Sequence, residues 1–354
     1  MSELLSRISE FVQDLAAGPV KQPKAITIPP QNCLPAGSCG TEIIKDKCYM
    51  TLTVNELFLS EARKWWTQYQ PMVVFATSFL HGGSTITVPA VVGPSLLEQP
   101  GKKLPQGLLL NNIEVAGPIP YRGGNVTVSV LLYRVQHTNH AKDLLKVVEG
   151  VSKAIGPTAD LGMLTKVGGA LMDGVGSLLA LGDTEPIMGH RFTMSPVGSG
   201  GMKTFYSALI DSGTQTSPNS LSVNSGRLLL GVGLGAQEFT THDYVLYSLF
   251  ASTRRTDESS LPFYLLFQRA KQDAFKGGED NWKTAKATFS EVWQQMIVSS
   301  DLIPDQAEEL FEEWKKMLLA EKERGEKVRV LSVGDKLAPA TDLRIEKAAS
   351  ILDM

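Results

Sequence analysis

The clearest pattern in the chain is an alternation of apolar and polar positions that recurs in short segments. In residues 126–133, valine or leucine at every second position alternates with Thr127, Ser129 and Tyr133. Successive side chains of a strand point to opposite faces, so this period of two predicts a half-buried strand. The other segments predicted as strands are 48–54, 72–80, 85–92, 108–115, 191–194, 204–210, 227–234 and 244–252.

Turn residues and chain order then predict how these strands assemble. Glycine, proline, asparagine and serine separate the strands, as in Gly82-Gly83 and Gly123-Gly124. Few helical segments lie between successive strands, whereas parallel βαβ units would require one at each crossover. The sequence therefore predicts a mainly β fold, an antiparallel β-sandwich with helical additions.

Between residues 141 and 182, apolar residues recur at intervals of three and four positions instead of at every second position. This spacing predicts an inserted α-hairpin whose two helices are separated at Gly156-Pro157. Five glycines occur between residues 160 and 181, and each costs a helix interior about 0.5 to 1 kcal/mol relative to alanine. Such a helix needs a close packing partner, either the body of the protein or, alternatively, a membrane or another chain. The candidate contact residues on its apolar face are Leu164, Gly168, Leu171, Val175 and Leu178.

Amphipathic helices are also predicted near both ends of the chain. Ser2 can cap the first helix, which ends before Gly18-Pro19. The last begins at Pro304, with acidic residues in its first turn, and ends at Arg324-Gly325, which suits the helix dipole. Another apolar stripe runs from Ala285 to Met296. The candidate contacts with partner helices are Leu4, Ile8, Phe11, Leu15, Leu310, Trp314 and Met317.

These patterns predict four parts of the chain. An N-terminal helix and an extended, Pro- and Gly-rich arm come first, and the sandwich follows. A C-terminal helical region and a tail with an edge strand at 328–333 complete the chain. The predicted bounds are 1–40, 41–258 with the hairpin at 141–182, 259–325 and 326–354.

Composition, net charge and cysteine count argue against some classes of function. The 354 residues are 43% hydrophobic and 20% charged, which is enough apolar material for a core. A net charge of −3 disfavours nucleic acid as a partner, because a surface that follows phosphates carries a basic excess. Three cysteines cannot form a disulfide framework, and charges interrupt the N-terminal apolar residues where a secretory signal would need an unbroken run. We therefore expect a cytoplasmic protein without a transmembrane helix.

No segment has the residues and spacing of a known catalytic, cofactor or metal site. Residues 198–204 approach a phosphate-binding loop, but Met202 replaces the required glycine and a strand follows instead of a helix. Ser199 lacks the first glycine of a nucleophile elbow. Cys33 and Cys39 lack a second ligand pair for zinc, and buried cysteine is the simpler interpretation. We therefore predict no cofactor and no metal, and we lean against an enzyme.

An aromatic segment offers one further candidate contact. Trp65 and Trp66 follow Arg63-Lys64, and Tyr69 is three residues later. Tryptophan and tyrosine suit boundaries that are apolar on one side and wet on the other, such as membrane surfaces and protein interfaces. The simpler interpretation is a pair of tryptophans that anchors a crossover between sheets.

Three function hypotheses remain. The leading one is a cytosolic, non-enzymatic interaction or assembly protein, in which the sandwich is the scaffold and the amphipathic helices contact other chains or further copies. The alternative is a membrane-acting protein that uses the glycine-rich hairpin or the tryptophan segment at a bilayer. The third is a hydrolase whose catalytic residues are distant in sequence.

Overall fold

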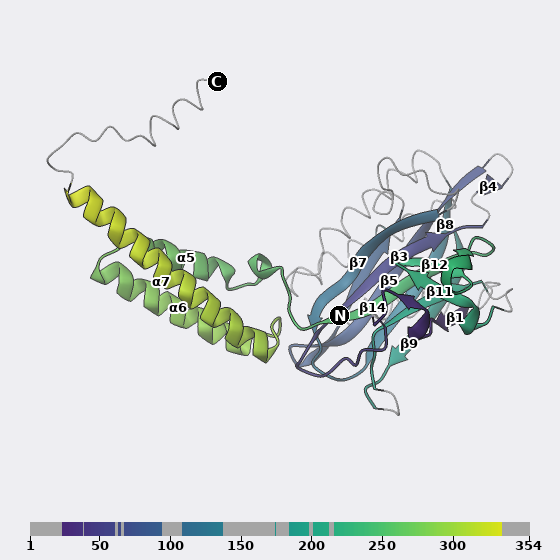
Figure 1. The fold of residues 1–354 in the computed structure, drawn as a ribbon, viewed down its shortest axis with the longest axis horizontal. Helices are drawn as coiled ribbons and strands as arrows, with labels where there is room; N and C mark the ends of the chain where they lie inside the picture. Colours follow the sequence, from purple (N-terminus) through teal and green to yellow (C-terminus); the bar gives the residue numbers. More distant parts are fainter. Residues whose placement is uncertain are drawn as a thin grey trace, which may run out of the picture. The chain divides into compact units, whose positions relative to one another are not determined.

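The computed structural model describes residues 23–334, except for 38, 61–62, 65–66, 94–107, 137–183 (apart from Gly174), 198–200 and 212–215. The chain forms two compact units with their boundary between Ser260 and Leu261. The first is a β unit and the second is built from helices (Figure 1).

The strands of the β unit form three sheets (Figure 1). Among the residues that the structure describes, all strand pairs are antiparallel except that of β2 with β11. The middle sheet has the order β1 (Lys24–Thr27), β10 (Phe205–Ile210), β14 (Tyr244–Ser252), β3 (Tyr49–Phe58) and β7 (Leu108–Pro120). The outer sheet contains β4 (Arg63–Lys64), β5 (Thr67–His81), β8 (Val126–Gln136) and β9 (Thr184–Met194), and β6 (Ser84–Val92) also pairs with β5. The small sheet has the order β13 (Gln237–Glu238), β12 (Arg227–Leu230), β11 (Leu221–Asn224) and β2 (Cys33–Leu34).

The middle sheet is covered on both faces, and β14 shows this most clearly. Val245, Tyr247 and Leu249 belong to the larger core, which the middle sheet shares with the outer sheet. Tyr244 and Leu246, which alternate with them, belong to a second core shared with the small sheet. Alternate side chains of one strand face opposite ways, so the middle sheet lies between the other two and the sandwich has three layers.

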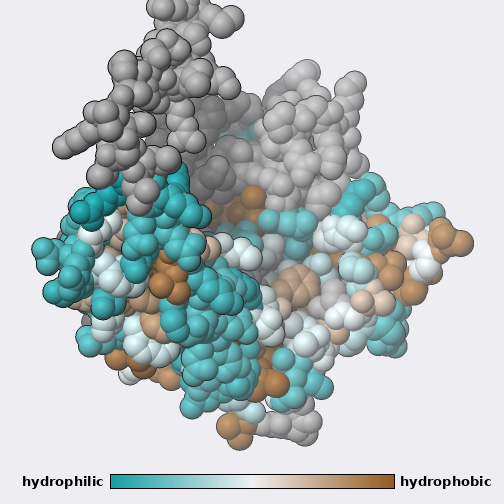
Figure 2. Space-filling model, turned by 60° about the vertical axis from the view of Figure 1, so that its left-hand side comes forward, coloured by the Kyte–Doolittle hydropathy of each residue, from teal (hydrophilic) through white to brown (hydrophobic). Residues whose placement is uncertain are grey.

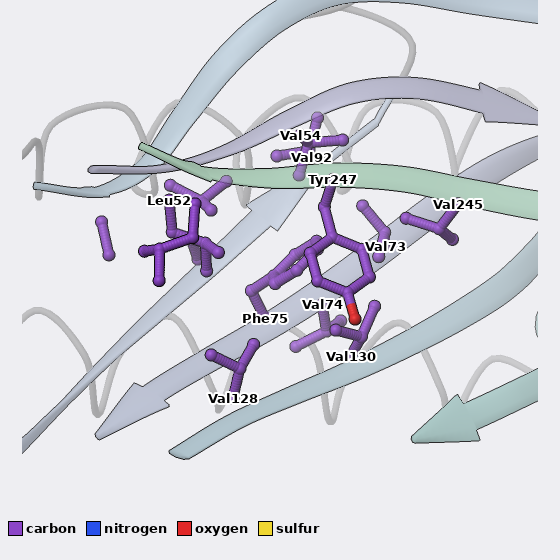
Figure 3. Packing of buried hydrophobic residues seen from close by; sticks show 14 of the residues in the cluster. Leu52, Val54, Val73, Val74, Phe75, Val92, Val128, Val130, Val245 and Tyr247 are labelled. Carbon is purple, nitrogen blue, oxygen red and sulfur yellow. The ribbon is translucent and has the colours of Figure 1, made fainter. Parts of the chain in front are cut away.

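The larger core is built from branched and aromatic side chains. Figure 3 shows Tyr247 projecting from the green strand β14 toward Phe75, with Val128 and Val130 nearby on β8. Phe75 and Tyr247 pack edge to face, with ring centroids 5.9 Å apart. This geometry is favourable for aromatic pairs, and it fixes one strand of the middle sheet against the outer sheet.

The helical unit consists of α5 (Tyr264–Lys276), α6 (Glu279–Val298) and α7 (Pro304–Gly334). Gly277 and Gly278 join α5 to α6 with φ of 68° and 86°, a backbone conformation that favours glycine. The predicted stripe of α6 is buried, and Phe267 of α5 stacks on Trp314 of α7 with ring centroids 4.1 Å apart. The buried stripe of α7 is Ala307, Leu310, Trp314 and Leu318.

Helix α7 corrects the prediction for the C-terminal tail. Residues 328–333 are helical, not an edge strand, because α7 continues through Gly325 to Gly334. Gly325 does not end the helix. A Cβ atom at Gly325 would lie 2.0 Å from the carbonyl oxygen of Phe275, so the glycine allows α7 to approach the backbone at the end of α5.

The described part of the N-terminal arm is tied to the sandwich. The sequence predicts a linker or an extended arm with little periodicity for residues 21–40. The described part contains β1, which pairs with β10, and β2, which pairs with β11. Both strands are short, and pairing with distant segments stabilises them, which a local pattern does not reveal.

The predicted fold class is confirmed: the protein is an antiparallel β-sandwich with a C-terminal helical region. The inserted hairpin at 141–182 and the N-terminal helix lie outside the described residues. Among the described helices, none combines the length and apolar character needed to cross a membrane.

Candidate functional site

Strand β9 forms an edge of the outer sheet. It pairs with β8 on one side, and no described strand pairs with the other. His190, Phe192 and Met194 are half-buried, whereas Arg191 and Thr193 are exposed. One face of this edge strand therefore turns toward the interior of the sandwich and the other toward solvent.

A cavity of about 390 Å³ lies beneath the inner face of β9. It opens between β9 and the edge of the middle sheet, where β1 contributes Ala25 and Thr27 to its rim. Its volume is in the range of pockets that accept a small molecule or a large side chain. Its wall and floor consist of His190, Phe192, Met194, Phe205, Ser207 and Tyr247. We call this site the β9 cleft.

Aromatic rings line the β9 cleft in a connected group. Phe192 lies 5.9 Å from Tyr247 and 6.3 Å from Phe205 between ring centroids, and His190 stacks on Phe192 at 5.7 Å. Tyr247 also contacts Phe75 in the larger core. Because the rings are held by the core, the floor of the cleft is a firm apolar surface.

The polar groups of the β9 cleft are mostly uncharged at neutral pH. Burial lowers the pKa of His190 below its ordinary value, so its imidazole is neutral at pH 7. Burial raises the pKa of Tyr247, whose hydroxyl bonds with Ser207. Lys203, at the rim, is exposed. The cleft thus combines an apolar floor, hydroxyl groups and one cation at its mouth.

Residues 40–43, which we call the strap, hold the rim in place. Gly40 N donates to Thr204 O at 2.8 Å, and Thr204 N donates to Thr41 O at 2.8 Å. Ile43 N donates to the carbonyl of Met202, also at 2.8 Å. These bonds tie the segment before β10 to the N-terminal part of the chain, so the rim is ordered by contacts distant in sequence.

Of the predicted aromatic segment, only Tyr69 is described. It lies on β5, and the Arg134 guanidinium of β8 sits 5.4 Å from its ring centroid. Arg134 also pairs with Asp243 at 3.5 Å, and Asp243 accepts hydrogen bonds from Ser60 N and Oγ at 2.7 and 2.6 Å. Tyr69 therefore belongs to a polar link between the outer and middle sheets. Trp65 and Trp66 lie outside the described residues.

The predicted partner-helix residues separate into two groups. Leu310 and Trp314 are 0% and 1% exposed, so they form the core of the helical unit and offer no surface to another chain. Met317 is 46% exposed, because Leu318 takes its place in the buried stripe. The candidates outside the described residues are Leu4, Ile8, Phe11, Leu15, Leu164, Gly168, Leu171, Val175 and Leu178.

A buried carboxylate lies between the middle and small sheets. Glu56 on β3 is 1% exposed and accepts a hydrogen bond from Leu228 N at 2.6 Å. Its side chain also bonds with Tyr244, and its Oε1 is 3.8 Å from Arg227 Nε. Burial raises the pKa of Glu56 to about 7, although these partners act in the opposite direction. Glu238 completes the group by pairing with Arg227.

A second cavity, of about 410 Å³, lies on the face of the middle sheet away from the outer sheet. Thr51 and Thr53 line it with Glu114 and Asp257, and partial burial raises the pKa of Glu114, with a further rise from Asp257. Asp257 binds the buried Arg255, whose Nε and Nη2 lie 2.7 and 2.5 Å from its carboxylate oxygens. In this cavity Asp257 and Arg255 therefore already bind each other.

Several large apolar side chains are exposed outside the cleft. On the face seen in Figure 2, brown apolar residues occur in small groups separated by teal hydrophilic ones. Leu234 and Val232, in the glycine-rich loop between β12 and β13, are exposed. Scattered exposed apolar residues are normal on protein surfaces, so the β9 cleft, with its connected aromatic floor, is the better candidate for a binding site.

Within the described ranges, no group of three or more histidine, cysteine, aspartate or glutamate side chains could hold a metal ion. No family model, curated protein or solved structure matches this chain. The sequence pattern predicted one element of the β9 cleft, the strand at residues 191–194. It did not reveal that β1, β10 and β14 would meet beneath that strand.

Proposed function

We propose that this chain is a non-enzymatic binding and assembly protein whose β-sandwich receives an extended segment of a partner polypeptide along β9. The observation that carries this proposal is the edge of β9, with which no described strand pairs, directly above an open aromatic cleft. Addition of a strand to a sheet edge gives affinity through main-chain hydrogen bonds, and pockets for alternate side chains give specificity.

The chemistry of the cleft supports a polypeptide over other occupants. An unpaired strand edge presents N–H and C=O groups along its length, and another backbone satisfies them at the matching spacing. The cavity of about 390 Å³ accommodates a large apolar side chain from such a segment. Lys203 at the rim and Arg191 on β9 favour an acidic residue beside that side chain.

A display experiment tests this proposal. Random peptides of about 10 residues, near the upper length of ordinary strands, are selected on the immobilised full chain. We expect the selected peptides to share a large apolar residue with an acidic neighbour. Their affinities are then measured by fluorescence anisotropy.

A pair of matched variants locates the binding. Ala25→Trp places a bulky ring at the exposed rim of the cleft, and we expect it to weaken peptide binding at least about tenfold. Thr85→Trp adds the same side chain at an exposed position of β6, on another strand of the outer sheet, and should leave affinity unchanged. Equal affinity in both variants, or no selected peptide, would overturn the proposal. Self-association that Ala25→Trp abolishes would instead assign the cleft to a second copy.

The other functional hypotheses stay predictions. A membrane-acting role depends on the hairpin at 141–182 and on Trp65 and Trp66, which lie outside the described residues. A hydrolase would need a nucleophile and a base that converge, whereas in the second cavity Asp257 already binds Arg255. The cytosolic location remains a prediction that depends on cysteine usage.

A further inference from the structure

Two of the three cysteines meet in the core between the middle and small sheets. Cys33 and Cys39 are 1% and 7% exposed, and their thiols are in hydrogen-bond contact. Cys48 lies in the other core, where its Sγ donates to the carbonyl oxygen of Ile44 at 3.2 Å. No disulfide links the three cysteines in the structure. The sequence suggested incidental buried cysteines, but the fold places two of them together.

The surrounding backbone explains why these thiols meet. Cys33 begins β2 and lies opposite Val223 of β11 in the small sheet. After Cys39 the chain enters the strap at Gly40, where φ is +85° and a Cβ atom would lie 3.3 Å from the ring of Pro30. The chain therefore folds back on itself between Pro30 and Gly40. One thiol belongs to the edge of the small sheet, and the other adjoins the strap that bonds to Thr204.

We propose that Cys33 and Cys39 form a redox-sensitive pair that a small-molecule disulfide, such as oxidised glutathione, converts into an intramolecular disulfide. Cys39 is the more exposed, so its thiolate attacks the oxidant, forms a mixed disulfide and releases one glutathione. The Cys33 thiolate then attacks the Cys39 sulfur and releases the second glutathione. The two cysteine protons end on the two glutathione thiols, and the two electrons from the cysteines reduce the oxidant.

The environment predicts a slow reaction. Thiol–disulfide exchange requires the thiolate, and the neighbouring Cys39 together with burial raises the pKa of Cys33 far above its ordinary value. The pair therefore resists brief oxidation and responds to sustained oxidising conditions. This behaviour differs from that of exposed, low-pKa cysteines that sense peroxide.

The disulfide would close a loop from residue 33 to residue 39 and covalently join the edge of the small sheet to the residue that precedes the strap. Closing so short a loop restricts the unfolded chain, and we expect the melting temperature of the β unit to rise by about 5 °C. This inference is independent of the proposed peptide binding at β9.

The test uses the full chain incubated with oxidised glutathione at alkaline pH until no further change occurs. Unreacted thiols are then alkylated in denaturant and counted by intact mass. We expect a mass loss of about 2 Da before alkylation, with one alkylated cysteine, Cys48, instead of three. Peptide mapping should identify the Cys33–Cys39 link, and the melting temperature should rise.

Two cysteine variants make the test specific. Cys48→Ser should form the disulfide as the wild type does, because Cys48 lies in the other core. Cys39→Ser should form none, and its melting temperature should be the same in reduced and oxidised glutathione. Three alkylated cysteines in the oxidised wild type, a stable glutathione adduct, or a link that includes Cys48 would each overturn the proposal.

Discussion

The two faces of the middle sheet are packed in different ways. The face toward the outer sheet meets an extended core of apolar side chains, including Phe75, Val130 and Tyr247. The face toward the small sheet meets a smaller core that adjoins Glu56 and contains the thiol pair. The first interface is held by apolar burial, which depends little on pH or redox state. The second contains groups that gain or lose protons, so solution conditions can change its strength.

The largest expected effect comes from opening the apolar interface. Phe75→Ala removes a fully buried ring, and we expect the β unit to lose about 3 to 5 kcal/mol of unfolding free energy. Hydrogen exchange measured on peptides from β5 and β14 reports this loss separately from the helical unit.

The matched control for this prediction is Phe250→Ala. Phe250 lies on β14 but faces the second core and is only partly buried. We expect a clearly smaller loss there. If the two variants lost equal stability, apolar burial would not distinguish the two interfaces.

The next effect concerns pH and the second interface. Burial raises the pKa of Glu56 from 4.5 to about 7, so the folded protein binds this proton more tightly than the unfolded chain does. The resulting stability is fully present below pH 4.5 and is lost as the pH rises through 7, a change of about 3 kcal/mol. Urea unfolding of the β unit between pH 5 and 8 measures this slope.

Substitution of a neutral side chain should reduce the slope. Glu56→Gln keeps the shape of the carboxyl without its titration, so the slope should lose the contribution of Glu56 and retain only those of other shifted groups, such as His190 and Glu114. Glu238→Gln, which changes the exposed carboxylate of the same group, should retain most of the slope. A slope that is undiminished in Glu56→Gln would assign the pH dependence to another residue.

The smallest expected effect concerns Arg227, which lies beside Glu56 at the interface between the middle and small sheets. Arg227 is one-third exposed, and its pair with Glu238 is at the surface, so Arg227→Ala should cost less than about 1 kcal/mol at pH 5. At pH 8 the loss should be larger, because the ionised Glu56 then loses the nearby cation. Arg254→Ala removes a different surface pair, with Glu258, and its cost should be the same at both pH values.

The sequence predicted what depends on local periodicity. The alternation at residues 126–133 and the glycine turn between 80 and 85 match β8 and the β5–β6 hairpin. The stripe from Ala285 to Met296 is buried as expected. Each of these elements has enough length for its hydrophobic period to show.

The elements that the sequence pattern did not predict are stabilised by contacts between residues distant in sequence. Val328 and Val330 have β-branched side chains that favour a strand locally, but residues 328–333 continue α7. Strand β1 has four residues, and its pairing with β10 holds it in place. The β9 cleft combines side chains from β1, β9, β10 and β14, so no single segment could reveal it.

The order of strands in the middle sheet also has a consequence for biosynthesis. Leu52 of β3 pairs with Leu249 of β14, about 200 residues later in the chain. At translation rates of about 5 to 20 residues per second, about 10 to 40 s pass between the synthesis of β3 and that of β14, although β7, the other partner of β3, is made earlier. The outer sheet is complete only at residue 194, and the part of its apolar inner face that β14 contacts stays uncovered until β14 has been made. The nascent β unit is therefore exposed to aggregation until residue 252 has been added, and slower translation would prolong that exposure.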